Sequence, residues 1–254
     1  MGIRVYCYQQ GNPTSCLGHE LTWEKGRQLK RFDSNTYTYN ANGIRTSKTV
    51  AGVKHDYLLD GTKILREAWN YDETSKTYQD ILIPLYDNED SVCGIIYNNV
   101  PYYFLKNLQG DIVAITNKSG KVIGRYSYDA WGVPTIVKDD SACSIATINP
   151  FRYRGYYFDK EIEMYYLQSR YYDPALGRFV NADAPDFLVL SAFAGHTSGF
   201  DVFTYCLNNP AKDNDKLGGL SAEQVAAMFI PLAIFSMFAV ALLANCSQGL
   251  LAVA

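Results

Sequence analysis

Histidine and cysteine are the side chains in this sequence best suited to metal binding or nucleophilic catalysis. The 254-residue chain has three histidines, His19, His55 and His196, and none has the spacing of a metal-ligand pair. His196 and Ser198 lie close together in "GHTSG", but the G-x-S-x-G nucleophile elbow is absent. We therefore expect each histidine to be a surface or turn residue.

Other chemical signatures are also missing. The six cysteines, at positions 7, 16, 93, 143, 206 and 246, form no C-x-x-C pair, so neither a metal knuckle nor a disulfide framework is indicated. No dinucleotide-binding G-x-G-x-x-G follows a predicted strand, and neither G-x-x-x-x-G-K-[ST] nor H-E-x-x-H occurs. The sequence predicts no metal and no cofactor.

The composition favours a globular all-β protein. Hydrophobic residues make up 48% of the chain and charged residues 19%, which argues against disorder. The net charge of −3 gives no electrostatic reason to expect nucleic acid as a partner. The 21 tyrosines are more than an ordinary domain carries, and tyrosine favours the half-buried face of a pleated sheet.

A short turn signature recurs along the chain at intervals close to multiples of about 22 residues. In each copy Asn or Asp is followed three or four residues later by Gly. The acidic or amide oxygen opens the turn, and Gly adopts the positive φ that the turn requires. The clearest copies pair Asn40 with Gly43, Asn107 with Gly110, Asp129 with Gly132, and Asp173 with Gly177.

Between the turns, side chains alternate with the period of a β-strand. Residues 111–116 and 122–128 alternate in this way. Residues 164–172, "MYYLQSRYY", are interpreted as one more strand, with successive tyrosines on opposite faces. We expect an antiparallel meander of hairpins that forms a curved open sheet, with no helical period before residue 220.

The C-terminal part of the sequence differs. Ser221 and Gln224 form a capping box, so a helix should begin near Ala222. Residues 225–244, "VAAMFIPLAIFSMFAVALLA", carry no charge, and as a helix they would span about 30 Å, the thickness of a bilayer core. Pro231 should kink or break this helix. The segment should either contact a membrane or be buried in the fold.

The strand and turn residues resemble a known family. "YFLKNLQGDIVAITNKSGKVIGRYSYDAWGVPT" and "NPFRYRGYYFDKEIEMYYLQSRYYDPALGRFVNADAP" are similar to the core domain of RHS (YD) repeat proteins, and "GHELTWEKGRQLKRFDSNTYTYNANGIRTSKT" looks like YD repeats. The resemblance covers residues 11–185, with a family-like tail to residue 218. It implies part of a hollow β-cocoon that encloses a variable C-terminal toxin, as in large secreted or surface proteins of bacteria.

The resemblance implies four regions. These are YD-repeat hairpins over residues 1–100, the RHS repeat-associated core over 101–185, a core-closing loop or plug over 186–220, and a variable hydrophobic helical C-terminus over 221–254. So few repeats would leave an open sheet with exposed edges, which tend to associate. We therefore expect a fragment of a longer protein, or a piece that pairs with a neighbouring shell protein.

The resemblance also implies a candidate self-cleavage site. The family core ends in P-x-x-x-x-D-P-x-G-L, and many members cut themselves there with aspartates. One carboxylic acid polarises the scissile carbonyl and one carboxylate activates water, which requires two acids with separated pKa values. Asp215 matches the motif acid after Pro210, and Asp183 matches the acid of an upstream G-R-F-x-x-x-D-P motif, with Arg178 as its charge partner.

The sequence departs from both motifs. Lys216 and Ala184 stand where the motifs have proline, and Gly219 stands where leucine precedes the cut. The alternative is that both aspartates cap turns in a shell that does not cut itself. If cleavage occurs, we expect it near Gly218 to Leu220.

Three functions follow from the sequence. The first is a structural shell segment of a bacterial polymorphic toxin system, which carries or encloses a C-terminal effector; its partners would be its own or neighbouring shell segments and toxin cargo. The second is a membrane-active effector or anchor in residues 221–254. The third is a self-cleaving aspartate protease. The resemblance implies a bacterial protein that is secreted or associated with the cell surface as part of a larger system. The N-terminus itself shows no signal peptide, and membrane association would occur through the C-terminus.

Overall fold

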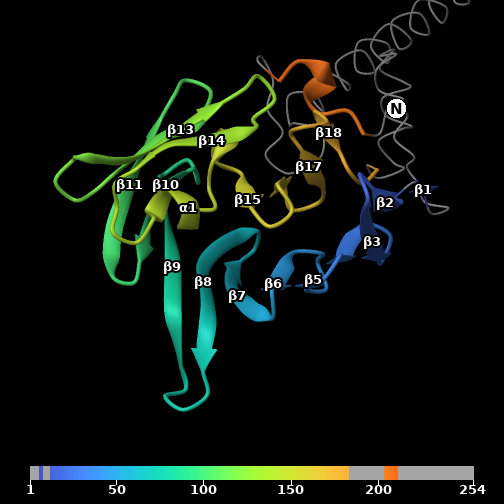
Figure 1. Ribbon diagram of the computed structural model, residues 1–254, viewed down its shortest axis with the longest axis horizontal. Coiled ribbons are helices and arrows are strands. Elements are labelled where there is room, and N and C mark those ends of the chain that lie inside the picture. Colours follow the sequence, from blue (N-terminus) through green and yellow to red (C-terminus); the bar gives the residue numbers. More distant parts are fainter. Residues whose placement is uncertain (1–5, 8–11, 183–202, 211–254) are drawn as a thin grey trace, which may run out of the picture. The chain divides into compact units, whose positions relative to one another are not determined.

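A computed structural model describes residues 6–7, 12–182 and 203–210 of the chain. A 14-stranded sheet takes up most of these residues (Figure 1), and each strand pairs with its neighbours in sequence. Its strands are β1 (Tyr6–Cys7), β2 (Pro13–Cys16), β3 (His19–Glu24), β4 (Gln28–Phe32), β5 (Asn35–Tyr39), β6 (Arg45–Val50), β7 (Val53–Asp60), β8 (Lys63–Asp72), β9 (Thr77–Tyr86), β10 (Val92–Tyr97), β11 (Val100–Lys106), β12 (Ile112–Thr116), β13 (Val122–Tyr128) and β14 (Pro134–Asp139).

The expected all-β antiparallel meander is confirmed, and the sheet is open because β1 and β14 are its two ends. The sheet continues without a break across residues 100–101, where we expected the repeats to meet the core. The division into four regions stays a prediction.

A second, four-stranded antiparallel sheet follows the meander in sequence. Its strands are β15 (Tyr157–Asp159), β16 (Met164–Tyr166), β17 (Tyr171–Asp173) and β18 (Arg178–Phe179). Every residue of β15, β16 and β17 is buried, so both faces of this sheet are covered. The described helices are short: α1 (Ile145–Ile148) and the 3-10 helices η1 (Tyr153–Gly155) and η3 (Cys206–Asn208).

The Asn/Asp–Gly turn signature forms the turns that the sequence predicts. Asn107 Oδ1 accepts the backbone N–H groups of Gln109 and Asp111, each at 3.0 Å, and Gly110 has a φ of 90°. The side-chain oxygen satisfies two turn amides, and backbone bonds from Asn107 N–H to the Asp111 carbonyl and from Gly110 N–H to the Asn107 carbonyl, each 3.1 Å, close the turn. The same pair of side-chain bonds forms at Asn40, Asp87, Asn117 and Asp129.

The expectation that residues 164–172 form one strand is wrong. They form β16, a tight turn and β17, and the two strands pair with each other. The Leu167 N–H donates to the Arg170 carbonyl at 2.9 Å, and Gln168 adopts a φ of 62°. The turn contains neither glycine nor proline, which are the residues that usually mark a turn in a sequence. The side chains also alternate on both sides of it, so the sequence gave no sign that the strand is interrupted.

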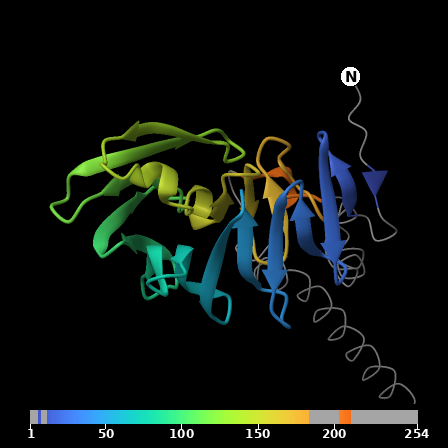
Figure 2. The same ribbon diagram turned by 60° about the horizontal axis from the view of Figure 1, so that its bottom comes forward.

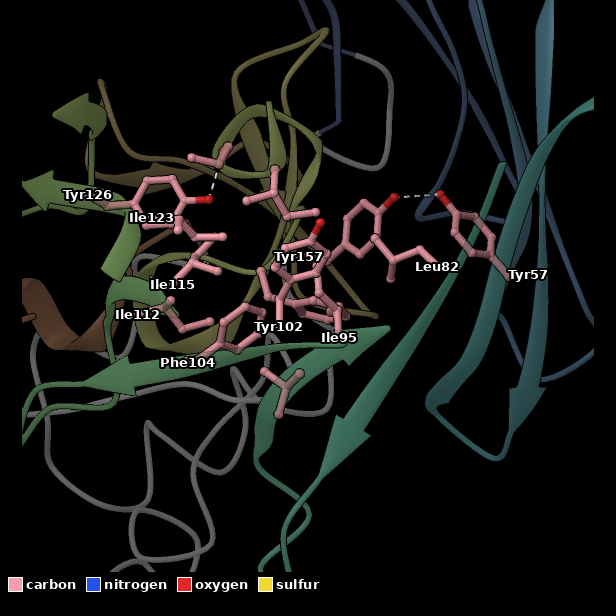
Figure 3. Close-up of a cluster of buried hydrophobic side chains, with 14 residues drawn as sticks. Tyr57, Leu82, Ile95, Tyr102, Phe104, Ile112, Ile115, Ile123, Tyr126 and Tyr157 are labelled. Atoms are coloured by element: carbon pink, nitrogen blue, oxygen red, sulfur yellow. Dashed lines mark hydrogen bonds between the residues drawn. The ribbon is translucent and has the colours of Figure 1, made fainter. Parts of the chain in front are cut away.

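Three clusters of buried hydrophobic side chains stabilise the described residues, and the second sheet contributes to each. In the largest (Figure 3), Leu82, Ile95 and Ile115 of the meander pack with Tyr157 of β15. The Tyr57 and Tyr157 hydroxyls also lie 3.0 Å apart in this cluster. The other two join β3–β5 to β16 and β17, and β15–β18 to residues 203–206. The second sheet therefore lies against the first strands of the meander (Figure 2).

Two expectations lie outside the described residues. The apolar helix expected over residues 221–254 lies there entirely, and so does the plug region over residues 186–220 apart from residues 203–210. Among the residues that the structure describes, no helix is long and apolar enough to cross a membrane.

Candidate functional site

Three buried charged side chains and one that is partly exposed lie between the meander and the second sheet. Arg45 and Lys48 come from β6, Asp159 ends β15, and Glu161 follows it in the next turn. The exposed fractions of the first three side chains are 1%, 6% and 0%. We call these four residues the buried charge cluster.

Asp159 is the centre of the buried charge cluster. Arg45 donates from Nη1 to Asp159 Oδ2 at 2.5 Å and from Nη2 to Oδ1 at 3.1 Å. Lys48 Nζ donates to Asp159 Oδ1 and to Glu161 Oε1, each at 2.9 Å. Two cations thus face two carboxylates, and the forked Arg45 contact fixes the relative orientation of β6 and β15.

Tyrosines surround the Arg45 guanidinium. Its central carbon lies 4.2 Å from the ring centre of Tyr166 and 5.1 Å from that of Tyr157, within the range of cation–π attraction. Nη1 also donates to the Tyr171 hydroxyl at 3.1 Å, and the Arg45 backbone N–H donates to the Tyr166 hydroxyl at 3.0 Å. Tyrosines of the second sheet thus hold a positive charge of β6 inside the fold.

The charged side chains of the cluster shift one another's pKa values. Burial alone would raise the pKa of Asp159, but the nearby charges of Arg45 and Lys48 outweigh it and lower that pKa. Burial likewise opposes the charges of Arg45 and Lys48, whereas Asp159 raises the pKa of both. The stability that Asp159 contributes is therefore present above its unfolded pKa and is lost only as the pH falls through the lower folded value.

A second buried acid lies next to the cluster. Tyr157 donates its hydroxyl to Glu67, 2.9 Å from either carboxylate oxygen, and His55 Nδ1 lies 2.7 Å from Oε1. Burial would raise the pKa of Glu67, but the contacts with His55 and Lys48 lower it. The expectation that His55 is a surface or turn residue is wrong, because its 19% exposed side chain lies on β7 and stacks on Trp69.

The structure describes one further histidine, His19. His19 is exposed on β3, 2.7 Å from Asp33, and His196 lies outside the described residues. No group of three or more His, Cys, Asp or Glu side chains in the described ranges is placed to hold a metal ion. Burial raises the pKa of several tyrosines, including Tyr126, to about 12, so these hydroxyls stay neutral.

Of the three residues implicated in self-cleavage, the structure describes only Arg178. It is exposed on β18, opposite Asp173 of β17. Asp173 caps the intervening turn by accepting the N–H groups of Ala175 and Leu176. Asp183 and Asp215 lie outside the described residues, so the acid pair stays a prediction.

The segment that leads toward Asp215 docks beside β18. Phe179 N–H donates to the Phe203 carbonyl at 2.9 Å, and Arg178 and Thr204 form an isolated antiparallel bridge. The buried Tyr205 ring then stacks on Tyr172 with 4.0 Å between ring centres. The structure therefore places residues 203–204, which precede Asp215 by at least eleven positions, beside the strand that precedes Asp183.

Sequence reasoning missed the buried charge cluster. Arg45 and Asp159 are 114 positions apart, and nothing in their spacing connects them. In the sequence Lys48 belongs to an ordinary polar strand, and Asp159 looks like one more turn acid. The only local signal is the density of tyrosines over residues 156–172. It indicates an unusual environment but does not show that charged side chains are buried there.

The chain is similar to shell proteins of known sequence and structure. Residues 70–211 match the family model described as Teneurin YD-shell. A tRNA3(Ser)-specific nuclease, WapA of Bacillus spizizenii, is 32% identical over 219 residues, which are 83% of this chain and 9% of that protein. The double-stranded DNA deaminase toxin A of Burkholderia cenocepacia is 28% identical over 42% of this chain and 7% of its own length.

The fold has a counterpart among solved structures. The crystal structure of TcdB2-TccC3-Cdc42 superposes with a TM-score of 0.65 at 20% identity. The match covers 86% of this chain and 11% of the other one. The chain therefore spans only a small part of the length of these relatives.

Proposed function

The chain belongs to the YD-shell family of RHS-type repeat proteins, and on that basis we propose that it is a shell segment that carries a C-terminal effector. The observation that carries this proposal is the buried charge cluster, which joins the repeat strands to the second sheet. Arg45, Lys48 and Asp159 are buried and pair with one another, so their arrangement suits a rigid structural joint and not a reaction.

The relatives support a carrier role for the shared region. One relative is named as a tRNA nuclease and another as a DNA deaminase, although both share this region with the chain. A region common to proteins of different chemistry is best explained as their common architecture, with the activity elsewhere in each protein. We propose that this chain likewise carries toxin cargo connected to it, as part of a secreted bacterial toxin system.

Neighbouring shell segments are the proposed partners. β14 is the last strand of the meander, and among the strands that the structure describes it pairs with β13 alone. Its other edge offers backbone N–H and C=O groups to a further strand, which is how exposed sheet edges associate. A segment of the same fold would extend the sheet there.

An exchange of residues 221–254 tests the carrier role. If these residues are cargo, replacing them in the full chain with an unrelated folded domain should leave the β-sheet circular dichroism unchanged and shift the thermal midpoint of the β part by less than about 4 °C. Loss of the β-sheet signal would contradict a carrier. Liposome partitioning that the parent chain shows and the exchanged chain lacks would instead support a membrane-active segment.

Self-cleavage is the second candidate function, and the docking of residues 203–204 on β18 favours it. β18 ends four residues before Asp183 in the sequence, and the docked segment precedes Asp215. Asp183 follows Arg178 by five positions and Asp215 follows Thr204 by eleven, and two carboxyl groups that come close together can share a proton. The chain would then cut itself after the core and release the residues that follow.

Intact-mass measurement of the purified chain tests the cut. We expect a fragment that ends near Gly218 to Leu220, and we expect Asp215→Asn to yield only the uncut chain. Asp60→Asn, which changes an exposed acid of β7, is the matched control and should cut like the parent. An uncut parent chain, or an Asp215→Asn chain that is still cut, would contradict self-cleavage.

A further inference from the structure

Arg154 connects three segments that are far apart in the sequence. Its Nη1 donates to the Gln109 carbonyl at 2.9 Å, and its Nη2 donates to the Pro210 carbonyl. Its own backbone N–H donates to Asp111 Oδ1 at 3.0 Å. One residue thus joins the β11–β12 turn, the helix η1 and the segment that leaves the second sheet.

The Arg154 side chain lies against a buried acid, whereas its bond to Gln109 lies at the surface. The side chains of Arg154 and Asp111 are 6% and 5% exposed, and Arg154 Nε lies 3.7 Å from Asp111 Oδ1. Asn107 Nδ2 donates to the other oxygen of Asp111 at 2.7 Å and holds the carboxylate in place. Arg154 itself has a φ of 55° and a ψ of 15°, a left-handed conformation that is uncommon for a residue other than Gly, Asn or Asp. The contact with Asp111 and the left-handed backbone together fix the direction in which the guanidinium points.

Pro210 is a distinctive place for such a contact. It is buried, and its carbonyl is its only backbone hydrogen-bonding group because proline has no N–H. The residues just before it are already fixed, since the N–H groups of Asn208 and Asn209 donate to the carbonyls of Tyr205 and Cys206. The Arg154 bond extends this order to the proline that begins the predicted cleavage motif, five positions before Asp215.

We infer that Arg154 is a positioning residue, which fixes the point where the chain leaves the core and thereby aligns the proposed cut. The inference rests in part on the proposed self-cleavage, but the anchoring of Pro210 can be measured separately. Arginine suits this role because its planar fork donates in two directions at once, toward Gln109 and Pro210, whereas a lysine ammonium presents a single compact charge.

The test uses the full chain with Arg154→Lys, Arg154→Gln and a matched control, Arg125→Gln, which removes an exposed arginine of β13. Arg154→Lys keeps a positive charge beside Asp111, so its thermal midpoint should stay within about 4 °C of the parent. Its self-cleavage should slow on the order of 100-fold, because a small displacement of the reacting groups has an effect of this size. Arg125→Gln should match the parent in both measurements.

Hydrogen exchange separates the anchor from the cut. In Arg154→Lys and Arg154→Gln the amides of residues 208–209 should exchange at least about tenfold faster, because their local opening is no longer opposed by the bond at Pro210. Unchanged exchange there, or cleavage at the parent rate in both variants, would overturn the inference. If the parent chain does not cut itself, the proposed self-cleavage fails, and the exchange of residues 208–209 alone decides whether Arg154 is an anchor.

Discussion

Replacing Asp159 with alanine should lower the free energy of unfolding by about 3–5 kcal/mol. The change leaves Arg45 and Lys48 buried without the carboxylate that both contact, and an unpaired buried charge is among the most destabilising features that a substitution can create. Urea denaturation followed by circular dichroism measures the loss. The low pKa of Asp159 means that the difference from the parent should persist at mildly acidic pH and shrink only when the acid is protonated in both folded and unfolded chains.

A solvent-exposed pair provides the control for Asp159. Glu73 lies 2.7 Å from Lys76 in the β8–β9 turn, and both side chains are exposed. Glu73→Ala should change the free energy of unfolding by less than about 1 kcal/mol, because water and salt screen exposed pairs. Equal losses for Asp159→Ala and Glu73→Ala would show that Asp159 is not buried among cations.

Tyr165→Ala should also cost about 3–5 kcal/mol, the range for removing a large buried aromatic side chain. Tyr165 is fully buried in β16, and its hydroxyl donates to the Gly132 carbonyl at 2.8 Å. Its ring packs against those of Phe158 and Tyr172, with 4.8 and 6.3 Å between ring centres. Alanine would leave a cavity in the cluster that holds the second sheet together.

Two further variants separate the ring of Tyr165 from its hydroxyl. Tyr165→Phe keeps the ring and leaves the Gly132 carbonyl without its donor, so a loss of about 1–3 kcal/mol is expected. Tyr103→Ala removes a ring that is 44% exposed on β11 and should cost far less than Tyr165→Ala. Thermal or urea denaturation of the three variants ranks them, and a Tyr165→Ala loss no larger than that of Tyr103→Ala would contradict the packing described for the second sheet.

Local features of the fold were predictable from the sequence because local chemistry determines them. A turn opened by Asn107 and completed by Gly110 needs only four or five neighbouring residues, and the structure forms it as expected. The side chains over β12 and β13 likewise predicted two strands, although β12 is covered on both faces. Together these features gave the all-β meander.

Features that carry no turn residue, or that depend on distant residues, were not predictable. The hairpin between β16 and β17 turns at Gln168, a left-handed residue with no glycine or proline beside it to mark the turn. The buried charge cluster depends on two strands that meet only in the folded chain. Alternation and propensity describe one strand at a time and carry no such information.

The candidate site was predictable only in part. The resemblance identified Arg178 and the two acids, and the structure adds that β18 pairs with the segment before Asp215. Arg154 escaped attention because its acceptors are backbone carbonyls, at Gln109 and Pro210, whose position no side-chain pattern reveals.

A double-mutant cycle between Arg45 and Asp159 tests most directly whether the second sheet is joined to the repeat strands. The single variants Arg45→Met and Asp159→Leu, the double variant and the parent would be compared by urea denaturation. Because the two side chains pair in the buried interior, we predict a coupling energy of at least about 1–3 kcal/mol, with the double variant more stable than the two single losses together imply. Additive losses, with a coupling energy near zero, would contradict the contact and with it the proposed joint of the shell.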